Sequence, residues 1–113
     1  MTNMNTESID DARENAKAYF LGFLSDSDDF TQLGYLTGFL RDRLPNESPD
    51  AIRTLTQSII KELMEIYGVY VVDIWTGTRS GVTSAKVMKE IEEVFRETNG
   101  VPDVGDGIWF GID

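Results

Sequence analysis

The spacing of hydrophobic positions predicts helices along the first part of the chain. Over residues 8–24, apolar side chains recur every three or four positions, and charged residues fill much of the opposite face. Ser8 has the type and position of a capping residue for this helix. Residues 28–43 repeat the apolar spacing and end before Pro45, which closes the element. The pattern therefore predicts two consecutive helices.

The third helix has the clearest boundaries. Ser48 can act as the N-cap, and Pro49 fits the first turn, where its missing N–H costs nothing. A wide apolar stripe continues to Ile66, and Gly68 suits the position just beyond a helix end. Most of the aromatic residues on the first two helices fall on the faces predicted to point inward, so we expect them in the core: Tyr19, Phe20, Phe23, Phe30 and Phe39.

A strand–helix–strand pattern follows. Val69–Trp75 is rich in β-branched and aromatic residues, which predicts a strand buried on at least one face, and residues 76–81 predict a turn. Apolar spacing over 83–98 predicts a fourth helix, and residues 108–112 alternate as a short last strand. The chain between the two strands is long enough for a right-handed parallel crossover.

These elements predict an α+β fold in which three N-terminal helices precede a strand–helix–strand unit, with a small sheet packed on the helices. The 113 residues fit a single domain, 1–113, in which residues 1–6 form a loose tail. A sheet of two strands is weak alone. It must be covered by the helices, extended by a strand that the pattern does not reveal, or extended by another chain.

The composition limits the catalytic and metal-binding chemistry that the chain can carry out. The chain has neither cysteine nor histidine, so it lacks thiolate nucleophiles, the usual general base at neutral pH and the commonest metal ligand. Its acids gather in two places, which capping and turn formation explain more simply than a calcium or magnesium site because the calcium-loop spacing is not met: Asp26, Asp28 and Asp29, then Asp103 and Asp106. We expect no enzyme activity, no metal and no cofactor.

The net charge of −10 opposes direct binding to nucleic acid or to an anionic membrane, and it suits a protein partner with a basic surface. The N-terminal segment is polar and acidic, unlike a signal peptide, and no apolar run approaches the roughly 20 residues of a membrane span. We therefore expect a cytoplasmic protein.

The stretch GVYVVDIWTGTRSGVTS resembles a phosphate-binding strand–loop–helix only in general outline. Its glycines, hydroxyls and single cation could hold an anion: Gly77, Thr78, Arg79, Ser80 and Gly81. The spacing of a Walker A motif is not met, however, because Val82 stands where that motif needs lysine. A structural turn, with glycine at positive φ and a hydroxyl N-cap, is the preferred interpretation.

The last strand offers a candidate contact with a partner. If Phe110 points inward, Trp109 and Gly111 point to the other face of a short strand that we expect to keep an open edge. Asp106 and Asp113 flank it. The alternative is a strand covered on both faces.

Two functions from different classes remain. The first is a non-catalytic acidic module that binds another protein, as an inhibitor, an immunity-type partner or an adaptor, and this class includes inhibitors that resemble DNA electrostatically. A second copy of the chain is a further candidate partner. The second function is a small phosphate- or anion-binding domain that uses the Thr76–Ser84 loop.

Overall fold

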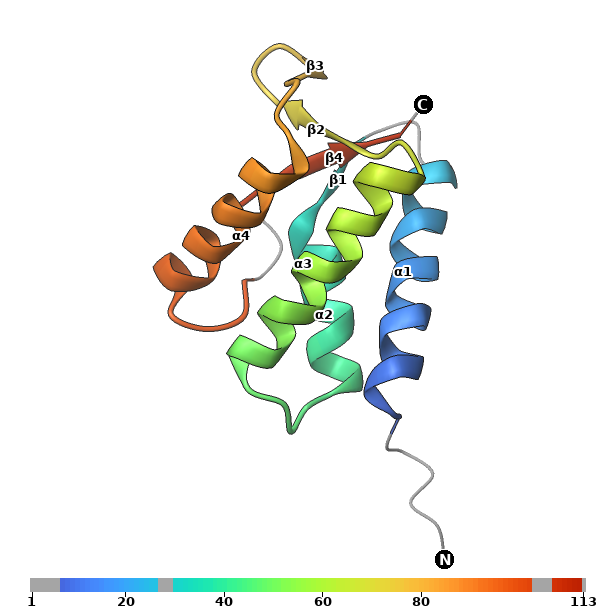
Figure 1. Ribbon diagram of the computed structural model, residues 1–113, viewed down its shortest axis with the longest axis vertical. Helices are drawn as coiled ribbons and strands as arrows, with labels where there is room; N and C mark the ends of the chain where they lie inside the picture. The colour runs from blue at the N-terminus through green and yellow to red at the C-terminus, as the bar shows by residue number, and fades with distance from the viewer. Residues whose placement is uncertain (1–6, 27–29, 103–106, 113) are drawn as a thin grey trace, which may run out of the picture.

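The computed structural model describes residues 7–26, 30–102 and 107–112. It has an α+β fold in which helices dominate, as the sequence predicts, and the order is α1, β1, α2, α3, β2, β3, α4, β4. The helices pack together as a bundle, and the sheet lies at one end of that bundle (Figure 1). The start of α1 lies at the opposite end. Residues 1–6, for which the sequence predicts a tail, are outside the described part.

The three N-terminal helices are α1 (Ile9–Asp26), α2 (Leu33–Arg43) and α3 (Pro49–Ile66). Two of them have the N-caps that the sequence predicts: the Ser8 hydroxyl accepts a hydrogen bond from the backbone N–H of Asp11, and the Ser48 hydroxyl accepts one from Ala51. Local capping chemistry thus sets where these helices begin.

The end of α3 also follows from its sequence. Gly68 adopts a left-handed φ of +78°, and the next N–H, that of Val69, donates to the carbonyl of Leu63 at 3.1 Å. This is the backbone arrangement that ends a helix and reverses the chain, and glycine adopts it without strain. The turn delivers the chain directly into β2.

The sheet has four strands in the order β1–β4–β2–β3, all antiparallel: β1 (Thr31–Gln32), β2 (Tyr70–Asp73), β3 (Thr78–Arg79) and β4 (Trp109–Gly111). The sheet is therefore extended by strands within the chain. Residues 28–43 do not form one helix, because α2 begins only after β1. Residues 76–81 hold β3 as well as a turn.

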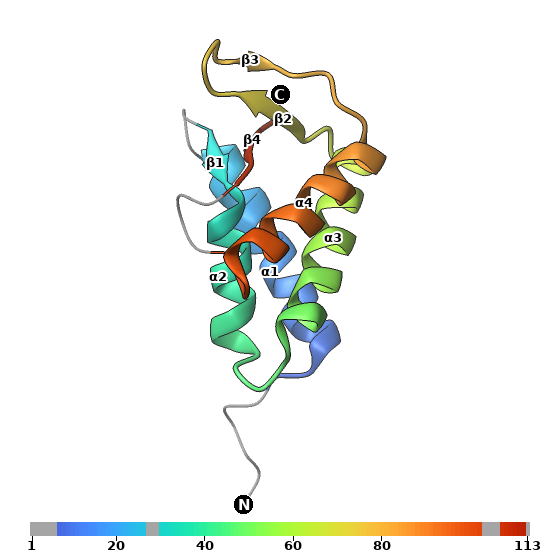
Figure 2. The ribbon, with the colours of Figure 1, turned by 90° about the vertical axis from the view of Figure 1, so that its left-hand side faces the viewer.

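The parallel crossover expected between the two longer strands is wrong. β2 and β4 pair antiparallel, with Val71 opposite Phe110. The reason is that β3 folds back along β2 before α4 (Ser84–Thr98) starts. The chain therefore enters α4 near the end of the sheet where β2 began, and not where β2 ended. The loop after α4 then brings the chain back into β4. From the side, α4 crosses in front of the other helices, with the sheet above it (Figure 2).

The core joins the helices to one face of the sheet. Phe20 of α1 and Phe110 of β4 are both fully buried, and their rings meet edge to face with centroids 5.9 Å apart. Aliphatic side chains from all four helices surround them, among them Leu36, Ile59 and Ile91. β4, which we call the central strand, is thereby fixed to α1, and the turn that joins β2 to β3 projects beyond this core (Figure 1).

Candidate protein-binding site

The hairpin of β2 and β3 presents the most exposed aromatic residue. Asp73 holds its turn together: its carboxylate oxygen Oδ1 accepts the backbone N–H of Trp75 at 2.9 Å, and its carbonyl accepts that of Gly77 at 2.7 Å. Gly77 has a φ of +70°, which a residue with a side chain rarely adopts. The hydroxyls of Thr76 and Thr78 bond to each other at 2.6 Å across the turn. The turn is thus fixed by its own hydrogen bonds.

The side chains of this turn point into solvent. Trp75 is 91% exposed and Ile74 is 50% exposed. β2 ends at Asp73, so the buried strand expected to continue to Trp75 ends two residues earlier. An ordered backbone that carries an exposed tryptophan is a suitable binding element, because little conformational freedom is left to lose on association.

The candidate anion-binding residues lie in the second half of this hairpin and after it. Thr78 and Arg79 form β3, Gly81 has a left-handed φ of +78°, and Ser80 joins them. Several backbone N–H groups here already have partners: that of Gly77 donates to Asp73, that of Ser80 to the Val71 carbonyl at 2.9 Å, and that of Val82 to the Ser80 hydroxyl at 3.4 Å.

The start of α4 and the surroundings of Arg79 also favour a structural turn over an anion-binding site. Thr83 caps α4 with its hydroxyl, which accepts the N–H of Lys86. The Arg79 guanidinium lies over the Tyr70 ring, 4.1 Å from its centroid. It lines a hollow of about 280 Å³ together with the carboxylate of Glu65, which accepts a hydrogen bond from Ser84 at 2.8 Å. The hollow therefore carries both signs of charge, and the preferred interpretation remains a structural turn.

Trp109 does not lie at an edge. β4 pairs with β1 through Gln32 on one side and with β2 through Val72 on the other, so the expected open edge is wrong. Trp109 is half-buried, and Gly111 is buried against the Tyr70 ring. A partner role for Trp109 stays a prediction, without the edge that supported it. Asp106 and Asp113 lie outside the described residues, as do Asp28, Asp29 and Asp103.

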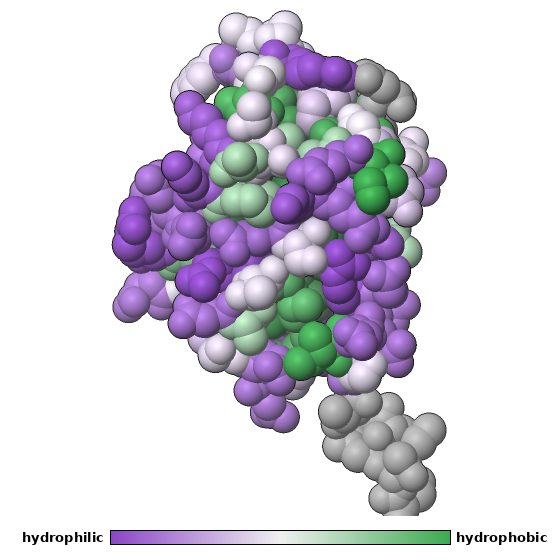
Figure 3. All heavy atoms as spheres, viewed as in Figure 1, coloured by the Kyte–Doolittle hydropathy of each residue, from purple (hydrophilic) through white to green (hydrophobic). Residues whose placement is uncertain are grey.

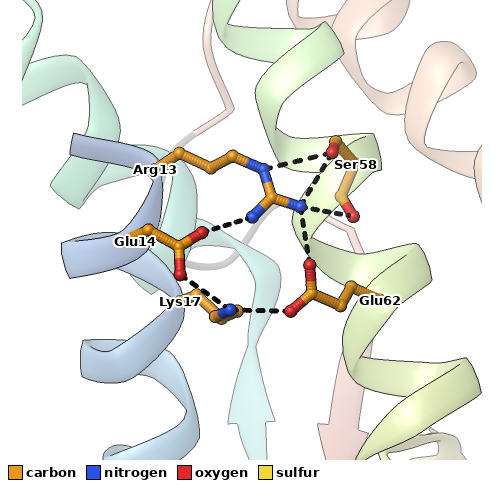
Figure 4. Close-up of polar contacts among 5 residues, drawn as sticks. All are labelled: Arg13, Glu14, Lys17, Ser58 and Glu62. Carbon is orange, nitrogen blue, oxygen red and sulfur yellow. Dashed lines mark hydrogen bonds and ion pairs between the residues drawn. The ribbon is translucent and has the colours of Figure 1, made fainter. Parts of the chain in front are cut away.

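A polar cluster joins α1 to α3 (Figure 4). Glu62 of α3 accepts from Lys17 at 2.7 Å and from Arg13 at 2.9 Å, and Glu14 contacts both cations from the other side. Arg13 also donates to the hydroxyl of Ser58. The hydrogen bond from Lys17 lowers the pKa of Glu62, and Arg13 lowers it further. The charges satisfy one another, so the cluster fastens two helices rather than presenting a reactive group.

Four aromatic rings pack in two pairs between α1 and α2 near the surface. Tyr19 stacks on Phe39 with centroids 4.6 Å apart, and Phe23 stacks on Tyr35 at 5.0 Å. Tyr19 is 40% exposed and Phe23 is 37% exposed, whereas Phe20 between them is buried. The expectation that all these rings lie in the core is therefore wrong for Tyr19 and Phe23. In the sequence, the signal that could have revealed this was Ala18 and Gly22, small residues on the same side of α1.

The surface offers no other obvious chemistry in the part of the chain that the structure describes. No group of three or more acidic, histidine or cysteine side chains gathers there to hold a metal ion, and none of the described helices is long and apolar enough to cross a membrane. Hydrophilic side chains cover most of the face seen in Figure 3, with separate apolar patches between them. No protein-family model matches the chain, and no curated protein or solved structure matches it significantly.

Proposed function

We propose that this chain is a non-catalytic acidic module that binds another protein, and that Trp75 enters a pocket of that partner. The observation that carries the proposal is the 91% exposure of Trp75 on a turn closed by hydrogen bonds to Asp73. Tryptophan is enriched among the residues that dominate the energy of protein interfaces. An inhibitor, an immunity-type partner or an adaptor could work in this way.

The charge of the chain favours a partner with a basic surface. The net charge is −10, and most of the basic side chains are already in ion pairs with acids of the same chain: Arg13, Lys17, Arg41, Arg43, Arg53 and Arg96. Most of the acidic side chains among the described residues are exposed to solvent. Electrostatic complementarity of this kind mainly speeds association and excludes wrong partners.

The exposed acids are spread over several elements. They include Asp10 and Asp11 of α1, Asp73 of the hairpin, and Glu92 and Glu93 of α4. Imitation of DNA would need these acids in a row on one face, which exposure alone does not supply. The proposal therefore assigns specificity to the hairpin and a general attraction to the charge.

The test is affinity capture from the native cells, with quantitative mass spectrometry, using the wild-type chain and Trp75→Ala as baits. We expect a captured protein to be lost with Trp75→Ala. With that protein purified, the variant should bind about thirtyfold more weakly, because truncation of a central interface tryptophan commonly costs about 2 kcal/mol or more.

A matched control removes apolar surface at the other end of the molecule. Ile9 begins α1, far from the hairpin, and is 45% exposed (Figure 1). Ile9→Ser should capture the same protein as the wild type. Equal capture by all three baits would refute the proposal for the hairpin, and loss of capture with Ile9→Ser alone would move the interface to the other end.

A further inference from the structure

A second surface with its own chemistry lies on α1. Ala18, Tyr19, Gly22, Phe23 and Asp26 line a shallow hollow of about 470 Å³. The two small residues form its floor: a Cβ added at Gly22 would meet no other atom within 4 Å. Glycine within a helix costs roughly 1 kcal/mol relative to alanine, and neither a turn nor a close contact accounts for it here.

The two rings at the hollow are held from behind. α2 supports one face of each, since Tyr19 stacks on Phe39 at 4.6 Å and Phe23 on Tyr35 at 5.0 Å. The two rings also meet each other edge to face, with centroids 6.0 Å apart, and the part of each that stays exposed forms one side of the hollow. Such rings attract cations through the negative charge of their faces. The same cluster already binds one internally, because the Arg43 guanidinium lies 4.6 Å from the centroid of Phe39.

The charge along this line of α1 has one sign. Helical spacing places Asp11, Asn15, Ala18, Gly22 and Asp26 on one stripe, which begins and ends with a carboxylate and includes no base. Positions 11 and 26 are about 22 Å apart along the helix axis at 1.5 Å per residue. Asp26 is exposed at the rim of the hollow. Exposed aromatic rings with a carboxylate at the rim complement a side chain that has an apolar stem and a cationic head.

We infer that this hollow on α1 is a docking site for a cationic segment of a partner protein, in which an arginine or lysine side chain lies over Gly22 along the open side of the Tyr19 and Phe23 rings and its charge meets Asp26. Arginine fits best, because its planar guanidinium stacks on aromatic rings and bonds to a carboxylate at the same time. The site is separate from the hairpin and does not depend on the role proposed for Trp75.

The test is a titration of the isotope-labelled chain followed by amide NMR shifts. The probe is a seven-residue peptide of alternating arginine and leucine, and the control peptide has glutamine in place of each arginine. We expect the arginine peptide to shift the amides of Ala18, Gly22 and Phe23, and the glutamine peptide to leave them unchanged.

Two variants that add an arginine at different places make the test specific. Gly22→Arg fills the hollow with the chain's own cation and should bind the peptide roughly tenfold more weakly than the wild type, whereas Ala85→Arg adds the same cation at an exposed position of α4 and should bind like the wild type. Arginine favours a helix over glycine and is nearly as good as alanine, so both variants should fold. Asp26→Asn should weaken binding severalfold, and Trp75→Ala should leave it unchanged.

Three results would overturn the inference. Shifts centred on Glu92 and Glu93 of α4 and unaffected by Gly22→Arg would show general attraction to acids. Equal shifts with the glutamine peptide would show that the cation is irrelevant. Self-association of the wild type in sedimentation, abolished by Gly22→Arg, would show that a second copy of the chain covers the hollow.

Discussion

The dipeptide Ile-Trp occurs twice in this chain, and the two copies differ in their exposure to solvent. Ile74 and Trp75 are 50% and 91% exposed on the hairpin turn, whereas Ile108 and Trp109 are partly buried at the start of the central strand. Each pair is near an apolar strand and a glycine. Local composition therefore does not decide which tryptophan is covered.

The order of the strands in the sheet determines which tryptophan is covered. β4 lies between β1 and β2, and its Phe110 reaches Phe20 on α1. The hairpin pairs on one side only, because β3 ends the sheet. A central strand receives neighbours on both sides from segments distant in the sequence, whereas an edge hairpin depends on local hydrogen bonds. The comparison predicts that substitutions in the central strand destabilise the fold and that substitutions in the hairpin turn alter binding.

The largest expected effect is at the central strand. Phe110→Ala should reduce the free energy of unfolding by about 3–5 kcal/mol, because it leaves a cavity against Phe20 and its other neighbours. Chemical denaturation followed by circular dichroism measures this loss. Ile74→Ala, on the hairpin turn, serves as the control and should cost well under 1 kcal/mol. Similar losses for the two variants would remove the distinction between the regions.

A methyl group should also be costly in this strand. A Cβ at Gly111 would lie 3.0 Å from the far end of the Tyr70 ring, so the ring and the Arg79 guanidinium on its face would have to shift. Gly111→Ala should therefore lose about 1–3 kcal/mol by overpacking. Gly22→Ala should instead gain up to about 1 kcal/mol, because it is helical and has open space. Thermal melts of the two variants should move in opposite directions.

The helices could be predicted from the sequence because their signals are local. α3 begins at its predicted cap, Ser48, and α4 begins after a hydroxyl N-cap of the predicted kind, which the structure places at Thr83. Asn99 follows α4 in a left-handed conformation with φ of 55°. The two short strands could not be predicted, because β1 and β3 have only two residues each and no alternation can be seen in two positions. Their pairing is a property of the assembled sheet.

The candidate site could also be predicted from the sequence only in part. The turn at Gly77 follows from residue types, but the exposure of Trp75 follows from where β2 ends, which the apolar run Val69–Trp75 conceals. The half-exposed rings of Tyr19 and Phe23 share the helical spacing of the core. Only the position of α2 determines that they lie at the margin of the core and that Phe20 lies inside it.

A smaller effect is expected at the polar cluster of α1 and α3, and it depends on pH. Lys17 and Arg13 lower the pKa of Glu62 below its usual 4.5, so the contribution of Glu62 to stability is present above about pH 4.5 and is lost as the pH falls through the lowered pKa. Glu62→Gln should cost roughly 1 kcal/mol at pH 7, the upper range for ion pairs near the surface. The difference between wild type and variant should shrink towards zero in acid. A difference that is the same at pH 7 and pH 3 would assign the effect to packing.

The smallest effect on stability is expected at Trp75, and this sharpens the comparison with Trp109. Trp75→Ala removes a side chain that is 91% exposed, and its backbone N–H still donates to Asp73, so the free energy of unfolding should change by less than about 0.5 kcal/mol. Because the chain has only two tryptophans, the variant also isolates the fluorescence of Trp109. Acrylamide should quench wild-type emission in two components and the variant in one, with the accessible component missing. A stability loss of several kcal/mol would mean that Trp75 packs on the body of the molecule, and the hairpin would then belong to the core rather than to an interface.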